Sequence, residues 1–171
     1  MNLDYNEEYK SFEKEVQDFC KQYKDISFSD GAKIPFSAKG GSNKNTIKRS
    51  DWQKILIEKG YFARSVPKKY GGYGGETDIL KSRIIASEFS KFKIPTPMGG
   101  QGIDMLVPTL LELGTEQQKE KYIKPTLHGE MIWCQGYSEP NAGSDLASLQ
   151  TKAELINEES VSYTHLRAHE T

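Results

Sequence analysis

The residues best suited to chemistry lie in one short polar segment that follows an apolar run. A hydroxyl and a carboxylate, Ser138 and Glu139, come first, and a turn with a proline and Gly143 follows them. Turns of this kind can aim successive backbone N–H groups and hydroxyls at one point, which suits a phosphate, a carbonyl or an electron-rich ring edge. An ordinary turn between two strands, capped by Ser144 and Asp145, explains the same residues. Turn chemistry alone leaves both interpretations open.

Histidines and cysteines indicate no second chemical site. His165 and His169 lie four residues apart, a spacing that suits two metal ligands on a helix, but no third ligand stands near them, so we expect no metal. His128 is a lone histidine in a predicted loop, where solvent exposure is the default. Cys20 and Cys134 sit among apolar residues far apart in the chain, so we expect both to be buried and reduced, as in a cytoplasmic protein.

Several other classes of protein find no support in the sequence. The glycine-rich stretch 71–75 lacks the Lys-Ser/Thr ending of a P-loop and any preceding strand, so a flexible connector is the better interpretation. No Gly-x-Ser-x-Gly turn argues for a hydrolase. The apolar stretch 103–113 is interrupted and too short to cross a bilayer. The formal net charge of -1 over 171 residues gives no basic excess for nucleic acid.

Helical periodicity dominates the first half of the chain. Aromatic and apolar residues recur every three or four positions over residues 5–23, which predicts an amphipathic helix. Residues 28–45, rich in Gly, Ser, Asn and Lys, predict a loop. Ser50 and Gln53 have the spacing of a capping box and predict a short helix that ends at Gly60.

Two further helices are expected after the loop at residues 66–75. Thr77 is the predicted N-cap of the first, which ends before Pro95. Residues 98–113 predict a mostly buried helix, in which Pro108 either produces a kink or lies near the start of a turn.

A last, charged helix follows Gly114. Thr115 and Gln118 have the spacing of a capping box and mark its start. We expect it to run to about Ile123, because Pro125 should stop it.

The pattern then changes from helix to strand. Residues 131–137 are apolar without a helical stripe, and residues 149–155 alternate between apolar and polar, which predicts a half-buried strand. A polar loop at 138–148 separates the two strands. The fold class is therefore mainly α, with the opening of a β domain. The expected divisions are a helical domain over 1–128, the start of the β domain over 129–160, and a probable non-native tail over 161–171.

Three ordered motifs resemble the acyl-CoA dehydrogenase family. Residues 137–145 read Tyr-Ser-Glu-Pro-Asn-Ala-Gly-Ser-Asp and are similar to its Ser/Thr-Glu-Pro-x-Ala-Gly-Ser-Asp loop, with Asn141 where Gly is usual. Residues 66–75 look like its Pro-x-x-Tyr-Gly-Gly-x-Gly loop, and residues 114–125 like its Gly-Thr-Glu-x-Gln-Lys helix start and following proline. The resemblance extends over residues 5–155 and implies a helical domain followed by the first strands of a β-barrel domain, truncated before the second helical domain.

The resemblance also implies an FAD site. Tyr137 would lend main-chain groups to the isoalloxazine edge, and the Ser138 hydroxyl would bond the flavin. Gln135 to Ser144 would form the wall on one side of FAD. Gly143 and Ser144 would also contact the acyl-CoA.

The same resemblance implies where the substrate lies. The stretch from Met98 to Val107 resembles the helix that lines the acyl-chain pocket, where Gly102 would leave room for substrate; tight helix packing explains its glycines equally well. No catalytic residue is assigned, because the family's general-base glutamate comes from the later helical domain. Glu139 is therefore not expected to be that base.

The implied reaction is flavin-dependent α,β-dehydrogenation of an acyl-CoA thioester. Its implied partners are acyl-CoA and an electron-transfer flavoprotein or similar acceptor, with a homo-oligomer at full length and the fragment inactive alone. An acyl-CoA oxidase or related flavoenzyme on the same scaffold, and a non-catalytic helical interaction module, are the alternatives.

Overall fold

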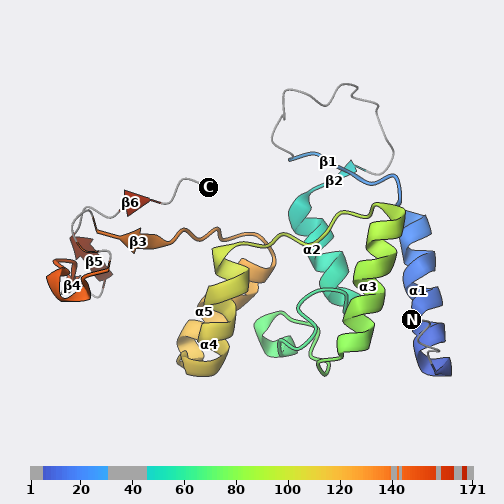
Figure 1. Cartoon of the computed structure of the whole chain (residues 1–171), viewed down its shortest axis with the longest axis horizontal. Helices are drawn as coiled ribbons and strands as arrows, with labels where there is room; N and C mark the ends of the chain where they lie inside the picture. The colour runs from blue at the N-terminus through green and yellow to red at the C-terminus, as the bar shows by residue number, and fades with distance from the viewer. Residues whose placement is uncertain are drawn as a thin grey trace. The chain divides into compact units, whose positions relative to one another are not determined.

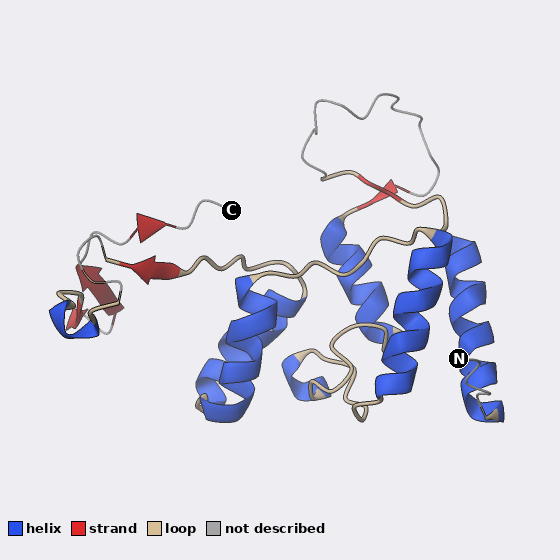
Figure 2. Cartoon of the chain, in the orientation of Figure 1, coloured by secondary structure: helices blue, strands red, loops and turns tan. Residues whose placement is uncertain are grey.

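The structure, a computed structural model, divides into two compact units (Figure 1). Unit 1 comprises Met1–Ile132 and unit 2 comprises Trp133–Thr171. Helices dominate unit 1 and strands dominate unit 2 (Figure 2), which confirms the mainly helical fold expected from the sequence. The residues that the structure describes are 6–30, 46–139, 142, 144–156, 159–163 and 167–168.

Helix α1 (Glu7–Tyr23) forms as the periodicity predicts. Its cap residue is Asn6, whose side-chain oxygen accepts the N–H of Tyr9 at 3.0 Å. Tyr5, the first residue of the predicted stripe, lies outside the described residues. The fully or almost fully buried residues of the helix are Val16, Phe19 and Cys20.

An aromatic core joins α1 to α2 (Arg49–Glu58) and α3 (Ile79–Phe92). Phe19 stacks on Trp52 and on Phe89, with ring centroids 5.7 and 6.0 Å apart. Offset stacking of this kind adds to the stabilisation that apolar burial provides. Between α1 and α2, two short strands pair in parallel, β1 (Ser27–Phe28) and β2 (Thr46–Ile47).

The start of α2 differs from the prediction. Its cap residue is Lys48, which makes no side-chain cap bond, and the carboxylate of Asp30 accepts the N–H of Arg49 instead, at 3.0 Å. The predicted capping box of Ser50 and Gln53 is wrong, because the Gln53 side chain is fully buried and bonds other segments. The Gln53 amide therefore bonds backbone groups in the core instead of the N–H groups at the helix start.

Helix α3 begins one residue later than predicted. Asp78, not Thr77, is the cap, and its carboxylate accepts the N–H of Lys81 at 2.9 Å. A carboxylate at this position both bonds the free N–H and favours the positive end of the helix dipole. The helix ends at Lys93, which has a φ of 55°, ahead of Pro95 as predicted.

The glycine-rich loop of residues 66–75 contains the short 3-10 helix η1 (Lys68–Tyr70). The side chain of Tyr70, the last residue of this helix, is buried. Gly72 lies so close to Val66 that a Cβ atom there would overlap the Val66 carbonyl oxygen. Close backbone approach, rather than flexibility, is what this glycine provides.

The helix predicted over residues 98–113 is shorter and less buried than expected. It begins with a π-helical turn, η2 (Gly102–Leu106), and continues as α4 (Val107–Leu113), in which Pro108 is the second residue. Because α4 continues directly from η2, Pro108 follows the point where the helix changes from π to α spacing, and the Val107 N–H before it donates to the Gly102 carbonyl. The prediction of a mostly buried helix is wrong, since Met105 is 52% and Leu113 is 78% exposed.

Helix α5 (Glu116–Leu127) begins at the capping box that the sequence predicts. The Thr115 side chain accepts the N–H of Gln118, and the Gln118 side chain accepts the N–H of Thr115 at 2.9 Å. The helix closes a second core cluster in unit 1, formed by Ile57, Val66, Tyr70, Val107, Ile123 and Leu127.

The predicted end of α5 is wrong, because Pro125 lies inside the helix. Proline lacks only its own N–H, so the turn around it can continue through other bonds. The Thr126 hydroxyl donates to the Tyr122 carbonyl at 2.6 Å, and the His128 N–H donates to the Lys124 carbonyl at 3.0 Å.

Unit 2 is built from short antiparallel strand pairs. Strand β4 (Lys152–Ile156) pairs with β5 (Glu159–Tyr163), and β3 (Gly136–Ser138) pairs with β6 (Arg167–Ala168). The predicted strands existed but were misplaced: β3 covers only the end of residues 131–137, and β4 begins after Leu149. The proposal of a non-native tail over residues 161–171 stays a prediction.

No helix in the described part of the chain is long and apolar enough to cross a membrane.

Candidate functional site

The predicted flavin-facing residues lie in unit 2, on and beside β3. Tyr137 and Ser138 are consecutive residues of this strand, and Gln135 precedes it with a half-buried side chain. Ser144 is exposed in the bend that follows. Gly143 lies outside the described residues.

Glu139 directs its carboxylate into its own loop. The side chain is 8% exposed. Its two oxygens accept the N–H of Gln150 at 3.1 and 2.9 Å and the N–H of Thr151 at 2.6 Å, and the Thr151 hydroxyl donates to the same carboxylate. These bonds join the residue that follows β3 to Gln150 and Thr151 at the other end of the loop.

These bonds keep the carboxylate ionised. The hydrogen bond from the Thr151 hydroxyl, followed by that from the Gln150 N–H, lowers the pKa of Glu139 below its usual value. A carboxylate that already accepts several donors gains little from a proton. Glu139 is therefore poorly suited to act as a general acid or base.

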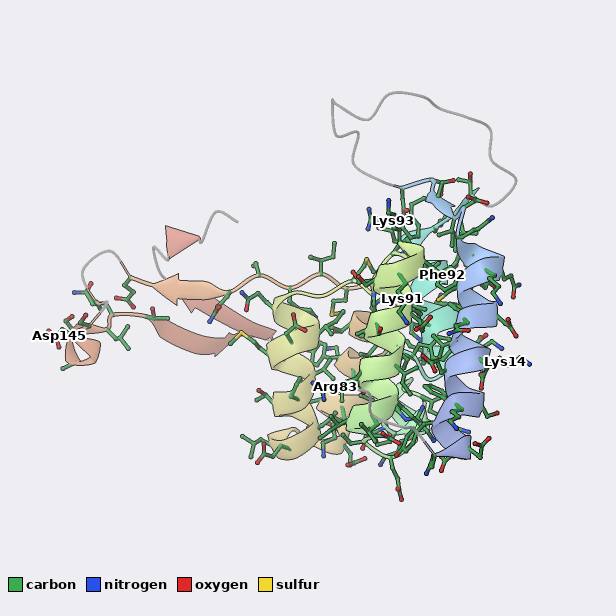
Figure 3. The ribbon with its side chains drawn as sticks, turned by 45° about the vertical axis from the view of Figure 1, so that its right-hand side comes forward. Lys14, Arg83, Lys91, Phe92, Lys93 and Asp145 are labelled. Carbon is green, nitrogen blue, oxygen red and sulfur yellow. The ribbon has the colours of Figure 1, made fainter. Side chains whose placement is uncertain are left out.

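The rest of the loop is shaped by local turns. Asp145 accepts the N–H of Ala147 at 3.2 Å and so caps the short 3-10 helix η3 (Leu146–Ser148). The Ala142 N–H donates to the Glu139 carbonyl at 3.3 Å. The Asp145 side chain, labelled in Figure 3, thus acts as the turn cap that the sequence indicates.

The predicted acyl-chain residues lie in unit 1, around the start of η2. Met98 is half-buried and Gly102 is buried. The Met98 methyl group lies over Gly129, where a Cβ atom would overlap it. Gly99 and Gly100, which precede the π turn, are exposed.

The buried side chain of Gln53 bonds this region, a role that no sequence pattern indicated. Its side-chain oxygen accepts the N–H of Met98 at 2.8 Å, and its side-chain nitrogen donates to the Leu127 carbonyl at 3.1 Å. One buried amide of α2 thus satisfies two backbone groups from the ends of other segments. The apparent capping pattern with Ser50 hid this role.

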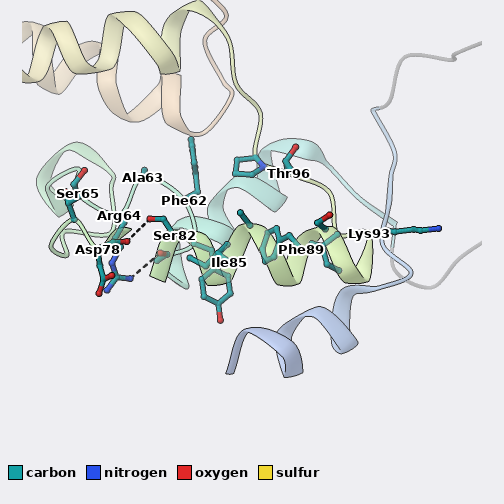
Figure 4. A pocket seen from close by; sticks show the side chains of 17 residues that line it. Phe62, Ala63, Arg64, Ser65, Asp78, Ser82, Ile85, Phe89, Lys93 and Thr96 are labelled. Carbon is teal, nitrogen blue, oxygen red and sulfur yellow. Dashed lines mark hydrogen bonds between the residues drawn. The ribbon is translucent and has the colours of Figure 1, made fainter. Parts of the chain in front are cut away.

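A cavity of about 760 Å³ lies along α3 in unit 1 (Figure 4). Ile85 and Phe89 of α3 and Phe62 of the preceding loop give it an apolar lining. In Figure 4 the labelled side chains of Arg64 and Asp78 lie toward one end of the view, and that of Lys93 lies toward the other. None of the residues singled out in the sequence for binding lines this cavity.

His128 is less exposed than predicted, with 15% of its side chain accessible. Burial lowers its pKa, and Lys54 and Lys124 act in the same direction, while Glu130 opposes them. The nearest carboxylate oxygen, on Glu130, lies 3.7 Å from Nδ1 and is itself bonded by Lys54 at 2.9 Å. The expectation of a solvent-exposed histidine is wrong, because α5 ends against the core.

The two cysteines differ from each other. Cys20 is fully buried, and burial raises the pKa of its thiol to about 11. Cys134 is exposed, so the prediction that both are buried is wrong for it. Both are free thiols.

Among the described residues, no three His, Cys, Asp or Glu side chains are grouped so that they could hold a metal ion. His165 and His169 lie outside those residues.

The helical unit and the loop of unit 2 agree with one protein class. Residues 6–130 match the family described as acyl-CoA dehydrogenase, N-terminal domain. The chain therefore belongs to the acyl-CoA dehydrogenase family.

Individual relatives come from several bacteria. The chain is 36% identical over 110 residues to acyl-CoA dehydrogenase IpdE1 of Mycolicibacterium smegmatis, a match that covers 64% of this chain and 28% of that protein. It is 43% identical over 89 residues to the short-chain specific acyl-CoA dehydrogenase of Clostridium acetobutylicum, which covers 52% of this chain and 23% of that protein. The chain thus spans about a quarter of the length of these relatives.

Solved structures show the same architecture. The Tcur3481-Tcur3483 steroid ACAD superposes with a TM-score of 0.54 at 28% identity, covering 95% of this chain and 39% of that one. The ChsE4-ChsE5 complex from Mycobacterium tuberculosis gives a TM-score of 0.54 at 24% identity, covering 95% of this chain and 38% of that one, and shows the fold alone.

Proposed function

We propose that this chain supplies one wall of the FAD and acyl-CoA site of an acyl-CoA dehydrogenase. The observation that carries the proposal is the loop of unit 2, in which Glu139 is turned inward and bonded by Gln150 and Thr151. In this arrangement donors of its own loop bond the negative charge of Glu139, and the backbone of Tyr137 and Ser138 would serve the ligand. Family membership supports the choice of ligand.

The residues present fit an isoalloxazine edge. That edge carries neutral donors and acceptors, which backbone N–H and C=O groups and a hydroxyl can match without a counter-ion. Tyr137 would offer its main-chain groups and Ser138 its hydroxyl. FAD, when bound, would supply the acceptor for a hydride. The chain's own residues would orient the ring and exclude water from one side of it.

The acyl-CoA thioester would lie against the same wall. Ser144, which is exposed, and Gly143 would contact it near the pantetheine. Met98 and Gly102 would border the acyl chain in unit 1. Glu139 would take no part in proton transfer, because hydrogen bonds to its carboxylate lower its pKa.

The test is a hybrid enzyme. Residues 6–156 of this chain would replace the matching segment of the Tcur3481-Tcur3483 steroid ACAD, whose superposition covers 95% of this chain. We expect the purified hybrid to retain FAD and to reduce an artificial electron acceptor when supplied with the acyl-CoA substrate of the host. A folded hybrid without flavin would contradict the proposal.

The remaining functional expectations are proposals of the same kind. We propose that the chain by itself binds FAD weakly, so stoichiometric flavin absorbance in a purified sample would contradict it. An electron-transfer flavoprotein as acceptor and a homo-oligomer at full length are expected from the family resemblance. A cytoplasmic location is expected from the two unpaired cysteines in the sequence. Oxygen consumption by the hybrid would favour the acyl-CoA oxidase alternative instead.

A further inference from the structure

The buried carboxylate of Glu139 accepts hydrogen bonds from other groups of the same chain. It is 8% exposed. One of its oxygens, Oε1, accepts the N–H groups of Gln150 and Thr151 and the Thr151 hydroxyl, and the other accepts the Gln150 N–H at 2.9 Å. Among the described residues, only these neutral donors account for the lowering of its pKa. No salt bridge is needed to hold the carboxylate in place.

Among the described residues, the bonds that Glu139 accepts join the two ends of its loop. Glu139 directly follows β3, and Gln150 and Thr151 directly precede β4. Within the loop, the Ala142 N–H and Ser148 N–H bonds are both long, at 3.3 Å. The bond from the Thr151 N–H to the carboxylate, at 2.6 Å, is shorter than either. Charge-assisted hydrogen bonds are about twice as strong as neutral ones.

We propose that Glu139 is the positioning residue of the flavin-facing loop. Its ionised carboxylate clamps the start of β4 to the end of β3 and thereby fixes the backbone of Tyr137 and Ser138. Its role is to hold geometry, and it neither donates nor accepts a proton during the reaction. The inference rests on the proposed function for the identity of the ligand, but the clamp itself can be measured without one.

The first experiment uses the whole chain and no flavin. Amide resonances of Gln150 and Thr151 would be followed by NMR between pH 7 and pH 3 in the unsubstituted protein, in Glu139→Gln and in Asp145→Asn. Asp145 is a matched control, because it is a carboxylate of the same loop that is exposed and caps only the local turn.

We expect both amides to titrate together, with an apparent pKa below the ordinary glutamate value of about 4.3. In Glu139→Gln this titration should vanish and hydrogen exchange at both amides should accelerate by about tenfold, which corresponds to the loss of about 1.4 kcal/mol of protection. Asp145→Asn should leave both amides unchanged. Wild-type exchange rates in Glu139→Gln would overturn the clamp.

The second experiment places the same substitutions in the hybrid enzyme. Glu139→Gln should weaken FAD retention by about tenfold relative to the unsubstituted hybrid, whereas Asp145→Asn should not. Equal FAD affinity in Glu139→Gln, together with altered amides, would overturn the positioning role. Absence of flavin in the unsubstituted hybrid would instead overturn the proposed function, and the amide titration would still decide the clamp.

Discussion

At the scale of single residues, buried polar side chains do more than their sequence positions indicate. Gln53 bonds backbone groups from segments distant in sequence, Glu139 bonds backbone groups at the far end of its own loop, and each is almost inaccessible to solvent. A buried donor or acceptor that loses its partner costs more than the bond itself contributes. Substitution of either side chain should therefore be destabilising.

Gln53→Ala should destabilise unit 1 by about 3 kcal/mol, because it leaves two backbone groups unpaired and opens a cavity. The groups are the N–H of Met98 and the carbonyl of Leu127. Urea unfolding followed by circular dichroism would measure the change. Gln22→Ala, at an exposed position of α1, is the control and should change stability by less than about 0.5 kcal/mol. Equal midpoints for both variants would contradict the prediction.

His128 should titrate below the ordinary histidine pKa of about 6.5 in the folded chain. Burial is the main cause, with Lys54 and Lys124 adding to it and Glu130 opposing it. A lowered folded-state pKa means that the unfolded chain binds the proton more readily. The stability that the neutral imidazole contributes is thus complete above about pH 6.5 and is lost as the pH falls toward the folded-state pKa. NMR titration of the imidazole, with a sample unfolded in urea as the reference, would check this; a folded-state value at or above the reference would exclude it.

At the scale of elements, a capping pattern predicted a helix start only where its side chains stay exposed. The box of Thr115 and Gln118 formed because both side chains are exposed and free to bond the local backbone. Gln53 had the same spacing from Ser50 but is drawn into the core. Pro125 did not end α5, because nearby groups continue the turn. Capping patterns are reliable where no tertiary contact competes for the side chain.

Gly72→Ala should destabilise the glycine-rich loop of residues 66–75 by about 1–3 kcal/mol, the usual cost of overpacking. The added Cβ would overlap the backbone of Val66, which cannot move aside as a flexible side chain can. Gly99→Ala is the control, because its nearest neighbour is the end of the Asp104 side chain at 3.3 Å. Thermal unfolding of the two variants should separate them by several degrees. Identical melting temperatures would show that the loop relaxes freely.

At the scale of the whole molecule, the two core clusters belong entirely to unit 1. They draw residues from α1 through α5 and none beyond Leu127. Among the described residues, both clusters are thus formed within unit 1.

A chain that ends at Ile132 should therefore fold by itself. We expect its free energy of unfolding in urea to agree, within about 0.5 kcal/mol, with the value obtained from the helical signal of the whole chain. Far-ultraviolet circular dichroism at matched concentrations would measure both. Loss of cooperative unfolding in the shorter chain would show that unit 2 contributes to the helical core.

The sequence by itself determined the order of the helices, the change to strands and the resemblance to the family. Local periodicity and turn chemistry depend on residues a few positions apart, so they can be recognised in the sequence directly. Only the tertiary structure decided that Gln53 bonds Met98 and Leu127 and that Glu139 ties its loop to Thr151. The physical reason is that a buried polar group must find its partners wherever packing places them, and packing brings together residues far apart in the chain.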